Sequence, residues 1–471
     1  MNIKTVFKNI SSLVVIEVVN QLSLLILAIL LPRYLGDIGF GQYSFVMSFT
    51  LLLNIFLDLG LRSLTIREVS RDETLVQKYL SNITLLKSGL AVITFLMIVI
   101  LANIIGYPLE IKIALYIMGI SIILNSYSEM FRSIFYAYQK MEFGAITLTS
   151  GKIVITLLVA VFLFWGYGLV EVMLAFLVGN LFALLLNYRI YVKNFPKPIL
   201  RFDFNFSKYL IISGLPFGLA IAFNTIFFNF DIVMISTYLN SAITGWYSVP
   251  VYVLTVLITF FYTVSAAIFP AFSKFHKTSQ DLLGDTYQKT FRYLLIFTLP
   301  IPPLLFLLAN SIIPYVFGQE FYNSIFIFQV LIWLLIPITL ARFMEMVLAA
   351  INRQITVTYV LGVFAMLNII LDIALIPVIG YMGAIIATII SQIFVFILDL
   401  YFISKYLKNP VTHYVMKFGM ILVIIGAISY LLMDINPIIS IMIIIGLYLI
   451  LLIALKCVRK EDVDILRSIF P

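Results

Sequence analysis

Apolar runs long enough to cross a membrane recur along the whole chain, and they restrict its fold more than any other feature. One such run reads LVVIEVVNQLSLLILAILL (13–31), and another contains IIGLYLILLIAL (444–455). A helix of about 20 apolar residues crosses the hydrocarbon of a bilayer. Hydrophobic residues make up 63% of the chain and charged residues 11%, against roughly 45–50% and 25% in soluble domains. The sequence therefore predicts an all-α integral membrane protein.

Glycine, proline and polar clusters divide the chain into about fourteen predicted membrane helices. Their approximate limits are 11–34, 42–66, 80–104, 112–136, 145–165, 169–192, 209–237, 244–270, 288–315, 321–350, 354–377, 381–404, 413–433 and 436–456. The boundary between the fifth and sixth depends on Gly166 and Gly168. The first apolar stretch is too long for a signal peptide and no cleavage site follows it, so we expect it to remain as a membrane helix.

Lysine and arginine predict the orientation of these helices. If the N-terminus is cytoplasmic, about 23 of the 30 basic residues fall in cytoplasmic segments, as the positive-inside rule requires. An even number of helices then places both termini in the cytoplasm. The net charge of +8 is explained by this topology, so we expect no nucleic-acid partner. The single cysteine, Cys457, excludes an intrachain disulfide.

The chain also contains an internal repeat. The segments YLGDIGFGQYS (34–44) and YLNSAITGWYS (238–248) align without a gap, and Asn20 aligns with Asn224 at the same offset. Each copy lies in the predicted extracytoplasmic turn that opens a set of six helices. Two such sets begin on the same face of the membrane, which predicts two pseudo-symmetric bundles related by an axis along the membrane normal.

This repeat predicts the organisation of the chain. Residues 1–193 form an N-terminal lobe of six helices, and 194–207 form a basic, aromatic linker on the cytoplasmic interface. Residues 208–406 form a C-terminal lobe of six helices, and 407–471 add two further helices and a cytoplasmic tail. Two similar lobes can rock about a shared site and open it to each side in turn.

Thirteen charged residues lie within the predicted helices. They are Arg62, Lys87, Arg132, Lys152, Arg342, Glu17, Asp58, Glu129, Glu171, Asp231, Glu345, Asp372 and Asp399. A charge near the bilayer centre costs roughly 2.5–3.5 kcal/mol, so these groups must face one another, a wet cavity or an interface. Polar residues at helical spacing indicate a common polar interior. The predicted stripes are Glu17, Asn20 and Gln21; Thr50, Asn54, Asp58 and Arg62; Ser121, Asn125, Glu129, Arg132 and Tyr136; and Asn368 with Asp372.

The fourth helices of the two sets carry matching charge motifs. At the repeat offset, Glu129 maps to Arg342 and Arg132 maps to Glu345. Residues three apart on a helix are neighbours, so each pair can close within its own helix. Two interpretations remain open. The pairs either neutralise themselves inside a polar core, or their arginines turn toward an anionic cargo, which a guanidinium binds through two hydrogen bonds.

The other buried charges also have alternative roles. Arg62 either binds cargo or pairs with Asp58, and Lys87 either lines the cavity or extends to the cytoplasmic interface. Asp231, Asn368 and Asp372 either bind Na⁺ or a proton, or make ordinary interhelical hydrogen bonds.

Motifs for enzyme chemistry are missing. SGKIV (150–154) lacks the glycine and the Ser or Thr of a nucleotide-binding loop, so we expect no ATP hydrolysis by that route, no cofactor and no metal centre. His276 and His413 fall in predicted cytoplasmic loops and are interpreted as solvated side chains. An enzyme of glycan assembly would need a carboxylate or histidine cluster on a substantial external loop, and the sequence shows none.

Two segments resemble the hairpin signatures of the Wzx-type polysaccharide flippases, a branch of the superfamily that includes the multidrug and toxin extruders. They are LPRYLGDIGFGQYSFVMSFTLLLNIFLDLGLRSLTIREVSRD (31–72) and GWYSVPVYVLTVLITFFYTVSAAIFPAFSKF (245–275). The fourteen helices and the doubled six-helix layout are similar to that family as well, so the resemblance covers nearly the whole chain.

The resemblance implies a monomeric transporter of the cell membrane. Such proteins move a polyprenyl-(pyro)phosphate-linked oligosaccharide from the inner to the outer leaflet, working with glycan-assembly enzymes. A cationic central cavity holds the headgroup, and the lipid tail passes through a gap between the lobes. The alternative is a cation-coupled extruder of small molecules with the same fold, because five buried bases and eight buried acids do not exclude a cationic cargo.

Overall fold

The computed structural model describes residues 3–196, 201–407, 411–433, 435–455 and 457, and for residues 3–11, 13 and 14 it describes the backbone alone. Within these ranges all regular structure is helical. Part of the predicted linker, residues 197–200, and the predicted tail, residues 458–471, lie outside the described residues. The chain is therefore all-α, as its apolar runs predict.

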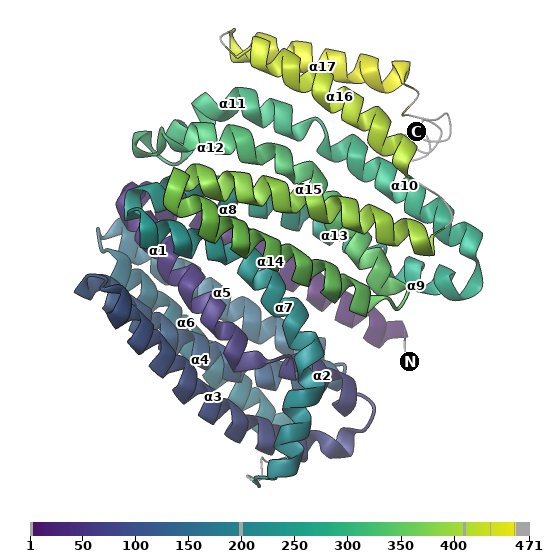
Figure 1. Cartoon of the computed structure of the whole chain (residues 1–471). Coiled ribbons are helices and arrows are strands. Elements are labelled where there is room, and N and C mark those ends of the chain that lie inside the picture. The colour runs from purple at the N-terminus through teal and green to yellow at the C-terminus, as the bar shows by residue number, and fades with distance from the viewer. Residues whose placement is uncertain (1–2, 197–200, 408–410, 434, 456, 458–471) are drawn as a thin grey trace. The chain divides into compact units, whose positions relative to one another are not determined.

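The described part of the chain holds seventeen α-helices, labelled in Figure 1. Their bounds are α1 Ile3–Asp58, α2 Leu61–Val69, α3 Val76–Ile105, α4 Leu109–Ala137, α5 Met141–Phe164, α6 Leu169–Asn194, α7 Phe204–Tyr238, α8 Ser241–Ala266, α9 Phe269–Thr278, α10 Gln280–Thr298, α11 Ile301–Val316, α12 Ser324–Leu331, α13 Leu335–Ala350, α14 Gln354–Ile379, α15 Tyr381–Tyr406, α16 Thr412–Leu431 and α17 Pro437–Ala454. Three short 3₁₀ helices cover Glu73–Leu75, Gln319–Phe321 and Ile332–Leu334.

Thirteen helical segments of the described chain are long and apolar enough to cross a membrane. The first, Val15–Asp58, is 44 residues long and contains a non-helical residue at Gly36. Because a single crossing needs about 20 residues, this segment supplies two crossings, and the total agrees with the predicted fourteen. The predicted boundary between the fifth and sixth helices is also confirmed, since α5 ends at Phe164 and α6 begins at Leu169.

The second predicted helix, 42–66, is interrupted, and the expectation of one continuous polar stripe there is wrong. Helix α1 ends at Asp58, and α2 begins only at Leu61. Leu59 and Gly60 between them have positive φ angles of 47° and 79°, which an α-helix cannot accommodate. Arg62 therefore leaves the stripe that Thr50, Asn54 and Asp58 begin. A Cβ on Gly60 would overlap the carbonyl oxygen of Gly214 on α7, so glycine permits both the turn and this close approach.

Contacts between Cα atoms divide the chain into two compact units. Unit 1 comprises residues 1–248 and 365–384, and unit 2 comprises residues 249–364 and 385–471. These units do not follow the predicted lobes, because α7 and part of α14 belong with the N-terminal helices. The division into repeat-based lobes stays a prediction.

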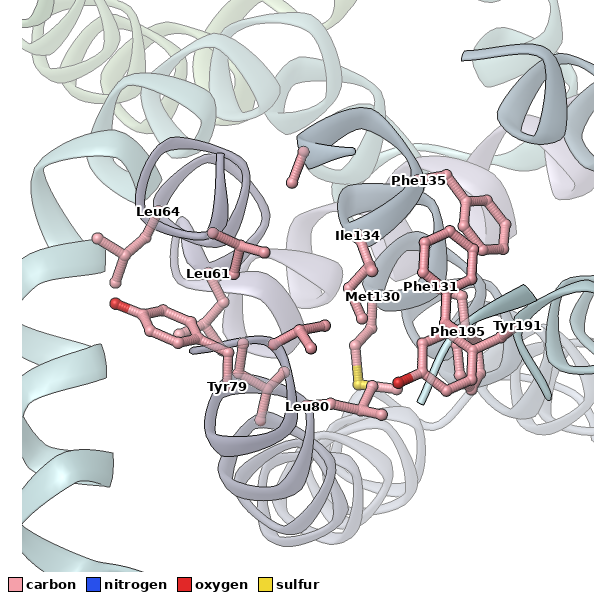
Figure 2. Close-up of a cluster of buried hydrophobic side chains, with 14 of the residues drawn as sticks. Leu61, Leu64, Tyr79, Leu80, Met130, Phe131, Ile134, Phe135, Tyr191 and Phe195 are labelled. Carbon is pink, nitrogen blue, oxygen red and sulfur yellow. The ribbon is translucent and has the colours of Figure 1, made fainter. Parts of the chain in front are cut away.

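In unit 1, α3, α4, α5 and α6 run side by side, and α1 packs on α5 and α7 (Figure 1). A cluster of buried apolar side chains joins α2, α3, α4 and α6 (Figure 2). Within it, the ring centroid of Tyr191 lies 5.3 Å from that of Phe131 and 5.4 Å from that of Phe195. This core fixes the segments of α2 and α4 that carry Arg62, Glu129 and Arg132.

The two copies of the repeated turn pack on each other within unit 1. A Cβ on Gly41 would overlap the carbonyl oxygen of Ser241, and a Cβ on Gly245 would overlap that of Asp37. In the repeat register Gly41 corresponds to Gly245, and Asp37 corresponds to Ser241. The contact is therefore reciprocal, as in an interface between two like surfaces. Trp246 Nε1 also donates a hydrogen bond of 2.9 Å to Asp37 Oδ2.

In unit 2, α10 packs on α9 and α13, and α11 packs on α12. The two C-terminal helices, α16 and α17, pack on each other and on α11. Tyr448 Oη of α17 donates a hydrogen bond of 2.5 Å to the carbonyl oxygen of Ile296 on α10. The two helices beyond the repeat are thus joined to unit 2.

Candidate functional site

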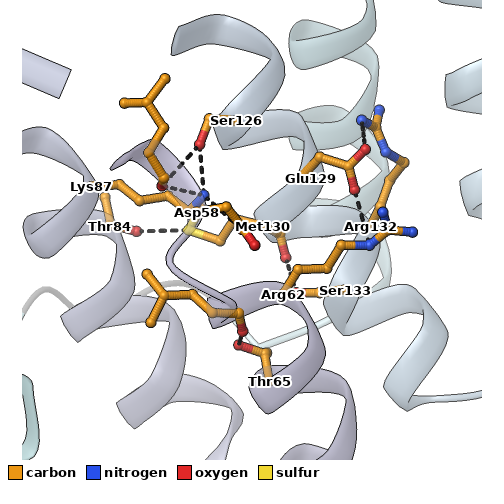
Figure 3. A network of polar contacts seen from close by, with 12 residues as sticks. Asp58, Arg62, Thr65, Thr84, Lys87, Ser126, Glu129, Met130, Arg132 and Ser133 are labelled. Atoms are coloured by element: carbon orange, nitrogen blue, oxygen red, sulfur yellow. Dashed lines mark hydrogen bonds and ion pairs between the residues drawn. The ribbon is translucent and has the colours of Figure 1, made fainter. Parts of the chain in front are cut away.

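Lys87 of α3 is the centre of a buried polar network in unit 1 (Figure 3). Its Nζ donates to Ser126 Oγ at 2.6 Å and to the Leu57 carbonyl oxygen at 3.1 Å, and it lies 3.5 Å from Asp58 Oδ1. The side chain is 3% exposed. The predicted alternative that Lys87 extends to the cytoplasmic interface is therefore wrong, because three acceptors from α1 and α4 hold its ammonium inside the unit.

Glu129 of α4 joins two arginines in the same network (Figure 3). Its Oε1 accepts a hydrogen bond of 2.7 Å from Arg132 Nη2, and its Oε2 lies 3.2 Å from Arg62 Nε. The predicted closure of the Glu129–Arg132 pair within its helix is confirmed. The alternative pairing of Arg62 with Asp58 is wrong, because the break after Asp58 turns Arg62 toward α4 and leaves Asp58 to Lys87.

The two arginines differ in how they face their surroundings. Arg132 is 3% exposed in its side chain and also donates to Asn125 Oδ1 at 3.1 Å, while its buried Nε has no hydrogen-bond partner among the described residues. Arg62 is 43% exposed, with its guanidinium carbon 5.9 Å from the ring centroid of Tyr136. The network holds three basic and two acidic groups, an excess of one positive charge. A partly exposed guanidinium with donors to spare can bind an oxyanion.

The repeat-related pair lies on α13 in unit 2. Arg342 Nη1 donates to Glu345 Oε2 at 3.1 Å, so this predicted pair is also confirmed. The side chains are 17% and 9% exposed. Asp399 of α15 is fully buried and interacts electrostatically with both members of the pair. Neither oxygen of Asp399 has a hydrogen-bond partner in the described part of the chain.

Asp231, Asn368 and Asp372 form a second polar cluster in unit 1. Asp231 of α7 and Asp372 of α14 interact electrostatically. Asp231 Oδ2 accepts a hydrogen bond from Tyr247 Oη, and its Oδ1 accepts one of 2.8 Å from the Ile232 amide. Asn368 and Asp372 are 1% and 0% exposed, and their polar side-chain atoms have no partner among the described residues. Unpartnered buried polar groups are costly, so this cluster is a candidate binding site.

The remaining predicted residues contribute less to these clusters. Glu17 accepts a hydrogen bond of 3.0 Å from Gln21 within α1, and Asn20 is half-buried one turn away. Asn54 lines a cavity of about 60 Å³ between α1 and α7, together with Asp58 and Thr225. Asn224 is half-buried on α7. None of the contacts described for Glu17 or Asn20 joins them to the network around Glu129.

Sequence reasoning missed several partners. The contacts of Ser126 with Lys87 and of Tyr247 with Asp231 were not predicted, and Tyr136, a member of the predicted stripe, was not predicted to lie against Arg62. Ser126 follows Asn125 of the predicted stripe, so its position on α4 carried a weak signal. Tyr247 belongs to the repeated turn, but no function was predicted for it. His276, interpreted as a solvated loop residue, instead lies half-buried on α9, and His413 is exposed on α16.

Comparisons with known proteins agree with this architecture. A family model described as polysaccharide biosynthesis protein matches residues 6–276. An uncharacterized membrane protein of Methanocaldococcus jannaschii is 25% identical over 190 residues, which are 40% of this chain and 37% of the relative. The match thus spans little more than a third of that relative's length.

Solved structures show the likeness of the fold. The lipid II flippase MurJ in an inward closed conformation aligns with a TM-score of 0.73 at 18% identity, covering 94% of this chain and 98% of MurJ. An inward-facing multidrug resistance MATE transporter of the MOP superfamily aligns with a TM-score of 0.63 at 15% identity, covering 82% and 94%. The MATE multidrug transporter DinF-BH also has a TM-score of 0.63 at 15% identity, covering 86% and 96%. With more than half of its residues inside the family match, this chain belongs to the polysaccharide biosynthesis protein family of multi-helix membrane proteins.

Proposed function

We propose that this protein is a flippase that moves a polyprenyl-(pyro)phosphate-linked oligosaccharide from the inner to the outer leaflet by alternating access of two lobes. The observation that carries the proposal is the Arg62–Glu129–Arg132 network, in which Arg132 is buried, Arg62 is partly exposed and positive charge is in excess, inside a membrane protein. Such charges are costly in a membrane and usually line a substrate pathway. Family membership and the MurJ-like fold support the same function.

The network suits an anionic headgroup. Glu129 holds both guanidinium groups without using all of their donors, and Arg62 stays partly exposed. A planar guanidinium can form two parallel hydrogen bonds to phosphate oxygens. In this proposal Arg62 and Arg132 bind the phosphate and Lys87 sets the positive potential, while the acids hold the three bases in position. Arg342, the charged partner of Glu345 in unit 2, binds the headgroup more weakly at another stage of transport.

An apolar groove in unit 2 suits the polyprenyl chain. It has a volume of about 380 Å³ and is lined by residues of α10, α12, α13, α15 and α16 and by Trp333 of the 3₁₀ helix Ile332–Leu334. Its lining is almost entirely hydrocarbon, and burial of apolar surface contributes about 25 cal/mol per Å². Helix α16 lies beyond the internal repeat, so one of the two additional helices contributes to a groove that a carrier of small soluble molecules would not need.

The cluster of Asp231, Asn368 and Asp372 is proposed to bind the coupling ion, either Na⁺ or a proton. Two buried carboxylates and an amide oxygen are hard oxygen ligands of the kind that alkali and alkaline-earth cations prefer. A cation or a proton would also remove the cost of leaving two interacting carboxylates unpartnered. Replacing Na⁺ by choline at fixed ionic strength and pH separates the two, because only a Na⁺-coupled protein loses transport.

The decisive experiment measures leaflet accessibility in vesicles reconstituted with the purified chain. A fluorescent polyprenyl-diphosphate-linked glycan is placed in the outer leaflet, and the fraction protected from an impermeant quencher is followed with time. We expect translocation well above that of empty vesicles. Vesicles whose exchange rate matches the protein-free control would refute the flippase function.

Substitution of the two repeat-related arginines tests the site in cells. Arg132→Ala and Arg342→Ala should each block glycan export while the protein still inserts in the membrane. Surface glycan is measured per inserted protein, and Arg71→Ala, which removes an exposed arginine outside the network, is the control. Normal surface glycan in the double variant would exclude a role for both residues.

The alternative is an extruder of small organic cations. The fold likeness to multidrug transporters such as DinF-BH supports it, while the positive excess around Glu129 opposes it. The same vesicles loaded with a fluorescent organic cation distinguish the two, because an extruder moves the dye and leaves the glycan in its leaflet.

A further inference from the structure

Unit 2 contains a second large cavity, far along the chain from the network around Glu129. It has a volume of about 510 Å³, within the range of small-molecule sites. Its walls come from α9, the first turns of α10, the turn between α13 and α14, and the end of α15. The positive-inside pattern places all of these segments at the predicted cytoplasmic end of the helices.

Two nitrogen-bearing side chains in this cavity lack partners. The exposed side chain of Arg353 makes no hydrogen bond or ion pair within the described residues, but its guanidinium carbon lies 4.3 Å from the ring centroid of Tyr406. Stacking on a ring holds a guanidinium while its N–H edge remains free. His276 Nδ1 is buried and also has no hydrogen-bond partner in the described chain. Both residues line the cavity, so the Arg353 guanidinium and the His276 ring can contact a bound group.

The backbone around these side chains is preorganised. Asn352 has a positive φ of 62°, and the Arg353 amide donates to the Leu348 carbonyl oxygen at 2.8 Å. This turn at the end of α13 fixes the direction in which Arg353 leaves the chain. Ser279 caps α10 by accepting from the Leu282 amide, and residues of the first turns of this helix line the cavity.

The cavity also carries groups that bind hydroxyls. Gln280 and Asn352 offer amides, and Asp281 offers a carboxylate. Gln280 Nε2 already donates to the His276 carbonyl oxygen at 3.2 Å, which leaves its amide oxygen as an acceptor. A bare inorganic anion would be repelled by Asp281 and would leave these groups unused. A phosphate that bears hydroxyl groups satisfies both sets.

We propose that this cavity binds a phosphate ester that carries hydroxyl groups, with Arg353 and His276 on the phosphate and Gln280, Asp281 and Asn352 on the hydroxyls. The ester can belong to a lipid headgroup of the cytoplasmic leaflet or to a soluble molecule. This site does not depend on the proposed flippase function, since it lies on other residues and makes no use of transport.

The test measures binding to the full-length purified protein in detergent by isothermal titration calorimetry. Three probes are used: dihexanoyl phosphatidylglycerol, soluble glycerol 3-phosphate and dihexanoyl phosphatidylcholine. Arg353→Gln removes the stacked guanidinium, and Asp281→Asn removes the carboxylate. Lys277→Gln is the matched control, because it removes one exposed positive charge from α9 outside the cavity lining.

We expect the native protein to bind phosphatidylglycerol more tightly than phosphatidylcholine. Arg353→Gln should weaken binding about tenfold, as loss of a charge-assisted hydrogen bond does, and Lys277→Gln should leave it unchanged. Asp281→Asn should weaken the binding of glycerol 3-phosphate a few-fold, because a hydroxyl loses its carboxylate acceptor, while the melting temperature stays unchanged, since Asp281 is exposed.

The two sources are separated by the probes. Binding of phosphatidylglycerol alone assigns a lipid headgroup, and binding of glycerol 3-phosphate as well assigns a ligand that needs no lipid. The proposal is overturned if neither ester binds, if phosphatidylcholine binds equally well, or if Arg353→Gln behaves like Lys277→Gln.

Discussion

The two fourth helices of the repeat carry the same four-residue ion pair with opposite order of charge, and their surroundings explain the order. Around Glu129 on α4 stand Arg62 and Lys87, so an acid at that position is held by bases from two other helices. On α13 the pair Arg342–Glu345 is accompanied by the buried Asp399. Both helices of the repeat thus contain the ion pair, and the order of its acid and base corresponds to the charges on the neighbouring helices.

The groups around the two ion pairs also differ in their balance of charge. The network in unit 1 has more bases than acids, and the group in unit 2 has two acids to one base. In the proposed transport cycle, opposite charge balance at matching positions lets the protein bind an anionic headgroup tightly at one place and weakly at the other. Equally tight binding at both places would stop transport.

The largest expected effect comes from reversing the charge order in each half. Glu129→Arg combined with Arg132→Glu replaces the carboxylate that now lies 3.2 Å from Arg62 Nε by a guanidinium. The new arginine at position 129 would lie beside Arg62 and the buried Lys87. Because leaving a buried charge without its counter-ion costs about 3–5 kcal/mol, we expect little inserted protein and a much lower melting temperature. Arg342→Glu combined with Glu345→Arg keeps its pair beside Asp399 and should accumulate near the native level. Equal losses in both double variants would contradict the comparison.

The next effect tests Lys87, the buried base beside Asp58 in unit 1. Lys87→Met leaves Asp58, Ser126 and the Leu57 carbonyl oxygen without their shared donor, and should destabilise the protein by about 3–5 kcal/mol. Adding Asp58→Asn should restore part of the melting temperature. Lys78→Met on the same helix removes a half-exposed ion pair with Asp203 and should cost about 0–1 kcal/mol. A loss for Lys78→Met as large as for Lys87→Met would show that burial does not set the effect.

A smaller effect tests the reciprocal contact between the repeated turns. Gly41→Ala and Gly245→Ala each place a methyl group against a backbone carbonyl of the other turn, which should cost about 1–3 kcal/mol. Once one substitution has separated the turns, the second has little left to disturb, so thermal unfolding of the double variant should add little to the worse single variant. Gly89→Ala, with nothing within 4 Å of the added carbon, serves as the helical control. Fully additive losses would mean that the two glycines do not share one contact.

The smallest effect is expected at Asp399. A carboxylate with both oxygens buried and unpartnered costs free energy when it is charged, so Asp399→Asn, which has the same shape and no charge, should leave the free energy of unfolding unchanged or slightly higher. The same change at Asp58, which contacts Lys87, should lower the free energy of unfolding clearly. Thermal unfolding of both variants measures the difference. A strong loss at Asp399 would reveal an ion pair there and would weaken the contrast between the two halves.

Much of the fold could be predicted because the signals are local. The helices follow from apolar runs, and the closures of Glu129 with Arg132 and of Arg342 with Glu345 follow from the three-residue spacing on a helix. The partners of Arg62 and Lys87 could not be predicted in this way. They depend on the break at Leu59 and Gly60 and on which faces of α3 and α4 meet, and no spacing along one helix contains that information.

The amino-acid sequence by itself determined that this is an all-α membrane protein with an internal repeat and paired charges at membrane depth. Hydropathy, helical periodicity and self-similarity are properties of the chain, so they are visible before it folds. Only the tertiary structure decided that Lys87 binds Asp58 and Ser126, that Arg62 turns to Glu129, and that Arg353 and His276 line one cavity. Those choices arise when side chains from helices distant in sequence compete for the same buried partners, because an ionised group removed from water must find its counterpart wherever the packing places it.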